Sequence, residues 1–518
     1  MKKTIIIIGA GPAGLTAAYE LLNNSKEYNV IILEESNYIG GLSRTVVHND
    51  NYMDIGGHRF FSKNKKVIEW WEKFLPKQGK PSCDDIELNR IFDNSKGSNP
   101  EKDNLVMLIR RRLSRIYYNK KFFDYPIKIN MKNIKKLGIQ NFILIFLSYI
   151  KTKIFKLPEN CLENFYINNF GKKLYSIFFE GYTEKLWGIK PKHISADWGI
   201  QRTKKLSINE IIKNNIKKLI PFIKADSHIS LIEEFYYPKY GAGQLWETVA
   251  SEIEKMGGKI FLNCKVTKLH LEKEIINKVT YCNNLIEHSI NADIIISSMP
   301  LKDLIIAIKN TPLKINQIAQ NLPYRDFVIV GVLVKKLKLK NETNIKTINN
   351  IIPDCWFYIQ DKDIKLGRIQ IFNNWSPYIV KDYKNTIWLG LEYFCNEHDE
   401  FWEMNENEWV NYAISELIKI GILSDKNILD FHVEKVQKAY PGYWGSYKNI
   451  NELVLYLNSF ENLYCIGRNG QHKYNNLDHS MCTAFETVNN ILYNVKNKNN
   501  IWNVNVEKEY QEIKSKNS

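Results

Sequence analysis

The alternation of apolar and polar residues predicts strands and helices in turn, with its strongest signal at the start of the chain. Residues 4–8 are almost purely β-branched, which is typical of a strand covered on both faces. Residues 15–22 have the apolar spacing of a helix, and a second apolar run covers residues 30–33. This order of strand, helix and strand predicts a βαβ unit with parallel strands.

A glycine-rich turn joins the first strand to the helix. Its sequence is Gly9-Ala10-Gly11-Pro12-Ala13-Gly14. Gly9 suits the tight turn, Gly11 lets the backbone approach a pyrophosphate, and Gly14 allows close packing of helix and strand. The N-terminus of the helix offers free N–H groups to an anion, and Glu34, about 20 residues after the last glycine, can bind ribose hydroxyls. The segment therefore predicts dinucleotide binding.

A second glycine pair follows the acidic residues Glu34 and Glu35. Residues 40–45 read Gly-Gly-Leu-Ser-Arg-Thr. This order of acid, short loop, glycine pair and basic residue resembles flavoproteins of the glutathione-reductase type. The resemblance favours FAD over a loosely held NAD as the cofactor.

The rest of the chain alternates between strand-rich and helix-rich regions. A hairpin turning at Asn119 is expected within 110–125, and a loop or mobile insertion within 80–104. Residues 131–220 have helical spacing. Further strands are expected at 226–242, from 257 continuing through 264–266, and at 292–299, 327–337, 355–359, 368–372, 386–393 and 463–467, with helices at 244–256, 409–420 and 481–495.

These elements predict an α/β fold with a discontinuous cofactor domain. We expect a Rossmann-like FAD-binding domain of the glutathione-reductase type, an inserted α-helical domain and a substrate-side antiparallel β-sheet. The predicted boundaries are 1–79, 226–305 and 455–497 for the FAD-binding domain, 130–222 for the helical domain, 105–128 and 306–454 for the sheet domain, and 498–518 for a tail.

Composition narrows the class of protein. The 518 residues are enough for two or three domains, and 44% hydrophobic with 25% charged residues is usual for a globular protein. The net charge of +16 would attract polyanions, but lysine is abundant throughout the chain, and we attribute most of the positive charge to this general bias in composition. The eight cysteines include no C-x-x-C pair, which argues against a zinc site or a disulfide framework and suits the reducing cytoplasm. We expect no metal and see no signal peptide.

The longest apolar stretch is residues 142–150, half the length that a membrane span needs. A buried helix is the favoured interpretation. The lysines that flank the stretch leave a peripheral membrane contact or a partner subunit as alternatives, and a homo-oligomer stays open.

Six ordered motifs resemble those of UDP-galactopyranose mutases and span most of the chain. In chain order they are Gly56-Gly57-His58, GYTEKLWG at 181–188, WGIQR at 198–202, WFY at 356–358 with Arg368 and FNN at 372–374, Tyr440-Pro441, and 467–480 with Gly467-Arg468, Tyr474 and Asp478-His479-Ser480.

The resemblance implies an unusual use of FAD. In that family the reduced flavin N5 attacks the anomeric carbon and expels the nucleoside diphosphate. The covalent flavin–sugar adduct opens and recloses through another hydroxyl, and the diphosphate returns. NAD(P)H is the implied reductant, a UDP-sugar the implied substrate, and cell-surface glycan synthesis the implied purpose.

The motifs also imply a set of site residues. The catalytic candidates are His58, Arg202 and Arg368. The expected FAD contacts are Gly9, Gly11, Pro12, Ala13, Gly14, Glu34, Glu35, Gly41, Leu42, Gly56, Gly57, His58, Val266, Gly467, Arg468, Asp478, His479 and Ser480. The expected substrate contacts are Tyr125, Tyr182, Arg202, Trp356, Tyr358, Arg368, Asn373, Tyr440 and Tyr474. Two arginines can grip a diphosphate, and tyrosine hydroxyls add hydrogen bonds without charge. Alternatively, the arginines could form surface contacts or ion pairs, and the tyrosines could be core aromatics whose hydroxyl is hydrogen-bonded within the protein.

Two other classes compete with a mutase. An oxidase of the amine oxidase or protoporphyrinogen oxidase type shares the fold but would want an apolar tunnel without paired arginines. A non-catalytic flavin-binding or nucleic-acid-binding protein is favoured only by net charge, and the chain has no recognised nucleic-acid module. The pairing of Arg202 with Arg368 distinguishes a mutase from an oxidase.

Overall fold

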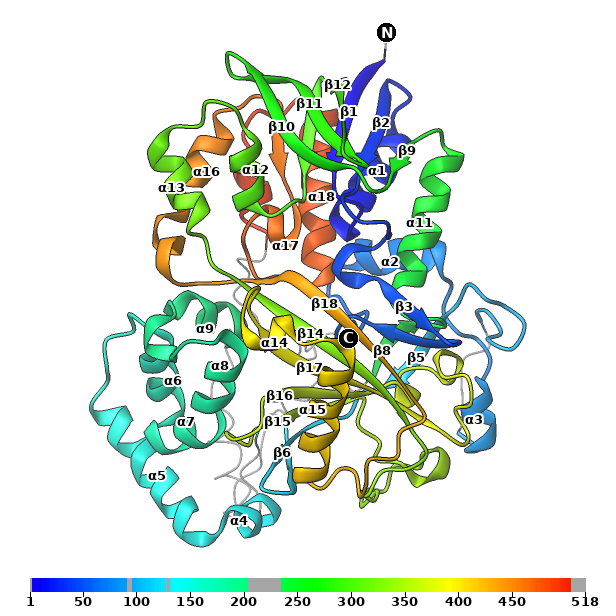
Figure 1. Cartoon of the computed structure of the whole chain (residues 1–518), viewed down its shortest axis with the longest axis vertical. Helices are drawn as coiled ribbons and strands as arrows, with labels where there is room; N and C mark the ends of the chain where they lie inside the picture. Colours follow the sequence, from blue (N-terminus) through cyan, green and yellow to red (C-terminus); the bar gives the residue numbers. More distant parts are fainter. Residues whose placement is uncertain (1, 91–95, 126, 128–130, 204–233, 505–518) are drawn as a thin grey trace.

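The computed structural model describes residues 2–90, 96–125, 127, 131–203 and 234–504, with only the backbone for a few of these, among them 201–203. Figure 1 shows two stacked parts. A parallel sheet with its helices forms the upper part, and a larger sheet forms the lower part, with helices α4 to α9 at its left edge.

The upper part is built on a five-stranded parallel sheet with the order β19-β13-β1-β2-β9. The strands are β1 (Lys3–Ile8), β2 (Tyr28–Leu33), β9 (Lys259–Phe261), β13 (Ile294–Ser297) and β19 (Leu463–Cys465). β19 therefore lies in the same sheet as the N-terminal strand, more than 400 residues away along the sequence.

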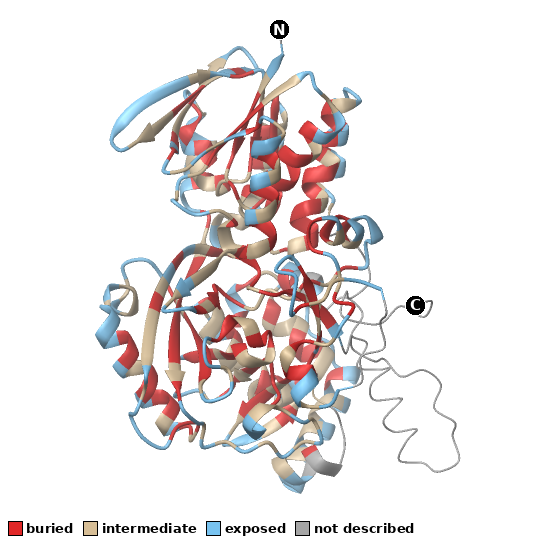
Figure 2. Cartoon of the chain, turned by 90° about the vertical axis from the view of Figure 1, so that its right-hand side faces the viewer, coloured by how far each residue is buried: buried red, intermediate tan, exposed pale blue. Residues whose placement is uncertain are grey.

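Both faces of this sheet are covered, which explains the β-branched run of β1. Ile5 and Ile7 pack against α1 (Pro12–Asn24), α2 (Lys65–Phe74), α11 (Gly243–Lys255) and α18 (Leu477–Leu492). Ile6 and Ile8 pack on the other side against α12 (Leu301–Ala307) and an antiparallel sheet of β10 (Lys265–Glu272), β11 (Ile275–Asn283) and β12 (Ile286–Asn291). Figure 2 shows the buried residues concentrated in these strands and helices.

The lower part is built on a seven-stranded sheet in the order β18-β14-β17-β16-β15-β6-β7. All pairs are antiparallel except β15 with β6. The strands are β6 (Ser114–Tyr118), β7 (Lys121–Asp124), β14 (Tyr324–Val334), β15 (Trp356–Ile359), β16 (Leu366–Ile371), β17 (Ile387–Cys395) and β18 (Asp430–Pro441). The hairpin turning at Asn119 is present, with Asn119 and Lys120 at positive φ.

Edge strand β18 was missing from the sequence prediction. Its residues DFHVEKVQKAYP are mostly polar, and only a few of them are buried. An edge strand pairs on one side only and needs no apolar run, so the few, irregularly spaced apolar residues of β18 gave no clear strand signal.

The remaining elements are shorter or lie outside the two large sheets. They are β3 (Thr45–His48), β4 (Asn51–Asp54), α3 (Cys83–Glu87), β5 (Met107–Arg111), α4 (Met131–Leu137), α5 (Ile139–Ile154), α6 (Leu162–Phe170), α7 (Lys172–Phe178), α8 (Glu180–Trp187), α9 (Ala196–Thr203), β8 (Glu234–Pro238), α13 (Leu313–Gln320), α14 (Glu400–Glu403), α15 (Glu406–Lys419), α16 (Ile450–Asn458), α17 (Gly467–Gly470) and α19 (Asn499–Trp502).

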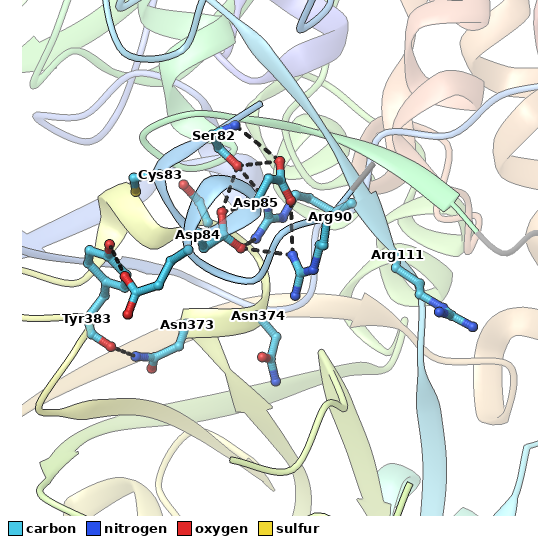
Figure 3. Close-up of polar contacts among 12 residues, drawn as sticks. Ser82, Cys83, Asp84, Asp85, Arg90, Arg111, Asn373, Asn374 and Tyr383 are labelled. Atoms are coloured by element: carbon cyan, nitrogen blue, oxygen red, sulfur yellow. Dashed lines mark hydrogen bonds and ion pairs between the residues drawn. The ribbon is translucent and has the colours of Figure 1, made fainter. Parts of the chain in front are cut away.

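Three local predictions were wrong. The segment from 257 through 266 is not one strand, because Asn263 has a positive φ and separates β9 from β10, which belong to different sheets. Residues 80–104 are not all loop, because they contain helix α3. The buried carboxylate of Asp84 accepts from Arg90 (Figure 3) and from the buried Arg110. The helix containing 142–150 is not buried, because its apolar side chains face outward. The expected strand residues 226–233 lie outside the described residues.

Candidate active site

The glycine turn after β1 has the geometry that close backbone packing requires. Gly9 has φ +102°, and its N–H donates to Leu33 O at 2.8 Å. A Cβ on Gly14 would lie 2.0 Å from Gly9 O, so only glycine fits there. Gly11 caps α1 without a side-chain hydrogen bond, which leaves the first-turn N–H groups to a ligand.

Glu34 stabilises this turn from the end of β2. Its Oε2 accepts from the N–H of Ala10 at 2.7 Å, and its Oε1 accepts from the N–H and the hydroxyl of Ser36 at 2.9 and 2.7 Å. The carboxylate thus joins the glycine turn to the loop after β2, at the position where a dinucleotide ribose is usually bound.

A cavity of about 470 Å³ runs along the turn. The predicted cofactor residues that line it are Gly9, Gly11, Pro12, Ala13, Glu34, Glu35, Gly41, Leu42, His58, Val266, Gly467, Arg468 and Ser480. The lining residues that sequence reasoning missed include Ser43, Cys264, Lys265, Thr267, Ser298, Met299, Asn475 and Asn476. Ser43, Asn475 and Asn476 lie within the motifs at 40–45 and 467–480, whereas the other residues belong to no motif and reach the cavity only through the fold.

The other predicted cofactor residues lie behind this lining. Gly14 packs helix against strand, and Gly56, at φ +115°, shapes the loop before His58. The carboxylate of Asp478 accepts from the Ser62 hydroxyl at 2.8 Å, and His479 Nδ1 accepts from the N–H of Asn476 at 3.1 Å. Gly57 faces the lower sheet, where a Cβ would lie 3.6 Å from Trp375.

The cavity suits FAD by its chemistry. A Cβ on Gly41 would come within 3.1 Å of Gly11 Cα, so two glycine backbones form one narrow wall. The uncapped start of α1 supplies amides for a pyrophosphate, and Glu34 and Glu35 line the ribose end. These residues would hold the dinucleotide part of FAD.

His58 carries no charge at neutral pH. Burial lowers its pKa to about 4, and the nearby guanidiniums of Arg468 and Arg368 disfavour the imidazolium further. Its Nε2 lies 3.2 Å from Ile55 O, within hydrogen-bonding distance. The imidazole can therefore contact a ligand without adding a third positive charge.

Two arginines lie near His58, with different partners. Arg368 on β16 forms an ion pair with the fully buried Glu392 on β17, and although burial acts the other way, this carboxylate raises the pKa of Arg368. Arg468 donates to the carbonyl oxygens of Asn475, at 2.7 Å, and Ala439, at 3.2 Å. Since Glu392 balances the charge of Arg368 but not that of Arg468, the three groups together carry one net positive charge.

Tyrosines surround the two arginines. Tyr358 lies 5.1 Å from Tyr125 and 5.6 Å from Tyr182 between ring centroids. Tyr440 and Tyr474 are stacked at 6.0 Å with the Arg468 guanidinium over both rings. Burial raises the pKa of Tyr182 and of Tyr440, so both hydroxyls stay protonated and able to donate.

One face of the lower sheet carries buried polar atoms close to the arginines and tyrosines described above. In the register of β15 and β16, Trp356 pairs with Gln370 and Tyr358 with Arg368, so alternate residues share a face. Within the described residues, Arg368 Nε, Gln370 Oε1 and Trp356 Nε1 are buried without a hydrogen-bond partner. Such atoms are costly to leave unpaired, and they mark where a polar ligand or water binds.

Of the predicted substrate residues, Asn373 stands outside this cluster, and the structure does not place the Arg202 side chain relative to it. The Asn373 amide donates to Thr386 O and accepts from the N–H of Trp388, and it lines a separate small cavity with Tyr383. Arg202 follows Trp198 by one turn of α9, and Trp198 contacts Tyr474, but the Arg202 side chain lies outside the described part of the chain.

Lys185, which sequence reasoning missed, joins α8 to the lower sheet. Its buried ammonium donates to the carbonyls of Ile359, Asp361 and Leu366 at 2.9, 3.2 and 2.9 Å. Burial lowers its pKa to about 8. It lies at the ends of the strands that carry Tyr358 and Arg368, and on the helix that carries Tyr182. The GYTEKLWG motif contained it, but its contacts come only from the fold.

Comparison with known proteins gives a family and a fold. Residues 12–441 match the family described as "Flavin containing amine oxidoreductase". An L-amino-acid oxidase from Sistrurus catenatus edwardsii is 33% identical over 129 residues, which are 24% of this chain and 21% of that protein. The chain thus matches about a fifth of the length of this relative.

Solved structures match the whole chain at low identity. The crystal structure of a reduced UDP-galactopyranose mutase superposes with a TM-score of 0.74 at 20% identity, over 98% of this chain and 100% of that one. A putative protoporphyrinogen oxidase from Exiguobacterium sp. 255-15 gives 0.65 at 12% identity, over 95% and 99%. The predicted fold class is confirmed. Within the described residues no helix is long and apolar enough to cross a bilayer, and no metal-binding cluster of His, Cys, Asp and Glu occurs.

Proposed function

The chain belongs to the flavin containing amine oxidoreductase family, and we propose that it is a flavin-dependent mutase that interconverts the pyranose and furanose forms of a nucleotide sugar. The observation that carries the proposal is the convergence of His58, Arg368, Arg468 and a set of tyrosine hydroxyls near the FAD cavity. A UDP-sugar is the proposed substrate, NAD(P)H the proposed reductant, and cell-surface glycan synthesis the proposed use.

The charges of the cluster support a diphosphate ligand. Arg368 and Glu392 form a buried pair, and the Arg468 guanidinium donates to backbone carbonyls. The net positive charge of these three groups suits a nucleoside diphosphate, which must be held near the sugar after it leaves and before it returns. We propose Arg202 as a further guanidinium for the diphosphate, because it follows Trp198 by one turn of α9 and Trp198 contacts Tyr474.

The remaining groups suit positioning more than acid–base catalysis. Tyr182, Tyr358 and Tyr440 provide hydroxyls for phosphate oxygens, and neutral His58 can donate or accept one hydrogen bond. Trp356 and Gln370 add unpaired buried polar atoms that can bind sugar hydroxyls. Reduced FAD, when bound, supplies the nucleophilic N5 for the anomeric carbon, and these side chains keep sugar and diphosphate aligned with it.

An FAD-dependent oxidase is the second candidate. It is favoured by the family match and by the short likeness to L-amino-acid oxidases. An arginine can also bind the carboxylate of an amino acid. The two guanidiniums amid several hydroxyls favour the larger, doubly charged diphosphate.

A product assay separates the two candidates. FAD-loaded protein is reduced with dithionite and incubated with UDP-galactose and a panel of other nucleotide sugars, and the products are separated by chromatography. We expect a furanose isomer from one of them with the reduced protein and none with a matched oxidised sample. Turnover of none of these sugars, together with hydrogen peroxide formation from amines or amino acids, would replace the mutase by an oxidase.

A further inference from the structure

Helix α5 (Ile139–Ile154) exposes its apolar face, whereas a surface helix normally packs that face against the protein. Its large apolar side chains are exposed, with Ile139 at 63%, Ile143 at 50%, Leu147 at 57% and Ile154 at 68%. The positions 139, 143, 147, 150 and 154 recur at helical spacing and form one stripe. Phe155 and Leu157 extend the exposed apolar surface past the end of the helix.

The inward face of α5 is polar and packs closely. Thr152 is buried, and its hydroxyl donates to Ser148 O at 2.8 Å, while Ser148 Oγ accepts from the N–H of Lys173 on α7. A Cβ on Gly171 would come within 2.9 Å of the Tyr149 backbone, so α5 and the start of α7 are in close contact. The apolar stripe therefore cannot turn inward without breaking these contacts.

The sequence around the stripe is basic, with Glu159, just beyond it, as a carboxylate that acts on Lys153 of the helix. Residues 125–158 contain no aspartate or glutamate, and lysines occur in the last turn of α5 and in the last turn of α4, which precedes it. Lys135, Lys151 and Lys156 are exposed. An apolar stripe with lysines beside it is the composition of helices that lie in the interface of a bilayer, and lysines near the surface are attracted to anionic lipid headgroups.

We propose that α5 and the following residues to Leu157 form a peripheral attachment surface for anionic lipid bilayers. With 16 residues and a rise of about 1.5 Å per residue, the helix is about 24 Å long, too short to span a bilayer but long enough to lie in its plane. The stripe enters the headgroup–acyl boundary, and the lysines contact anionic headgroups. This proposal is independent of the chemistry at the flavin site.

Vesicle binding tests the proposal on the full-length, FAD-loaded protein. Co-sedimentation is measured with vesicles of equal phosphatidylglycerol and phosphatidylcholine, and with vesicles of phosphatidylcholine alone. The key variant is Ile143→Asp with Leu147→Asp. The matched control is Leu455→Asp, a 73% exposed apolar residue on helix α16 in the other half of the molecule. FAD content and the elution volume of each variant report on folding and association.

The wild type should bind the anionic vesicles, and added salt should weaken the binding. The double variant should bind them about tenfold less tightly or worse, because burying one such side chain already corresponds to about one order of magnitude or more. Leu455→Asp should bind like the wild type. Replacing Lys135, Lys151 and Lys156 by Gln should reduce the preference for anionic lipid.

Three results would overturn the proposal. One is a wild type that does not bind anionic vesicles at low salt. Another is binding that survives the Ile143→Asp and Leu147→Asp change. The third is a wild-type dimer that the same change converts to a monomer while neither form binds vesicles, since the stripe would then be an interface between two copies of the chain.

Discussion

The ion pair between Arg368 and Glu392 allows substrate binding to be separated from stability. Glu392 is fully buried and also accepts from Gln370 Nε2 at 2.7 Å. Removing only one partner leaves an uncompensated charge, which costs about 3–5 kcal/mol of the free energy of unfolding, whereas removing both is often nearly neutral. Arg368→Met should therefore destabilise strongly, and Arg368→Met with Glu392→Gln should recover most of that loss. The Gln introduced at position 392 retains an oxygen for Gln370.

Binding should follow a different pattern from stability. A hydrogen bond to a charged group contributes about 1.5–3 kcal/mol, so loss of the Arg368 guanidinium should raise the Kd for UDP by about 10- to 150-fold. We expect this rise in the single and in the double variant, with FAD retained in both. Urea unfolding measures stability, and isothermal titration with UDP measures binding. A stable double variant that binds UDP like the wild type would refute the assignment of Arg368 to the diphosphate.

Three further predictions follow from the same contacts. Gly11→Ala should weaken FAD binding while the fold survives, because the new Cβ meets its nearest protein atom only at 3.8 Å, whereas Gly14→Ala should destabilise the fold, because its Cβ would lie 2.0 Å from Gly9 O. Flavin absorbance measures FAD binding and thermal unfolding measures stability. Equal effects of the two variants on both quantities would contradict the reasoning. His58→Asn should reduce the loss of stability on acidification. Because the folded protein lowers the pKa of His58 from 6.5 to about 4, the contribution of neutral His58 to the free energy of unfolding is full above pH 6.5 and is lost as the pH falls toward 4. Urea titrations should therefore show a smaller difference in the free energy of unfolding between pH 8 and pH 5 for the variant than for the wild type. Lys185→Met should raise the Kd for UDP several-fold and leave FAD affinity unchanged, because its three carbonyl partners lie at the ends of β15 and β16 and in the loop between them. Titrations with both ligands check this, and a variant that loses FAD instead would refute it.

Several elements were predictable because their cause lies in local sequence. The run 4–8, the glycine turn and the run 30–33 form the βαβ unit as expected, and most of the predicted cofactor residues line one cavity. The hairpin at Asn119 was also correct, because asparagine at the first turn position tolerates positive φ. Strand β18 was missed, since an edge strand carries little apolar signal.

The outward-facing helix α5 shows the limit of such reasoning. Its apolar residues predicted burial, and the periodicity was right, but which face meets the protein depends on what packs there. Ser148 accepts from the N–H of Lys173 on α7, and Thr152 is buried. The sequence of the helix alone does not show that this polar face, and not the apolar one, packs against the protein.

The sequence by itself determined the glycine turn, the fold class and the residue types available at the candidate site. The tertiary structure decided the pairing of Arg368 with Glu392, the hydrogen bonds of Lys185 to three backbone carbonyls, and the convergence of β15, β16 and β18 near His58. The physical reason is the range of the interactions. Backbone conformation and hydrophobic period are fixed by neighbouring residues, whereas the charge balance of a buried site is set by side chains brought together from strands far apart in the chain.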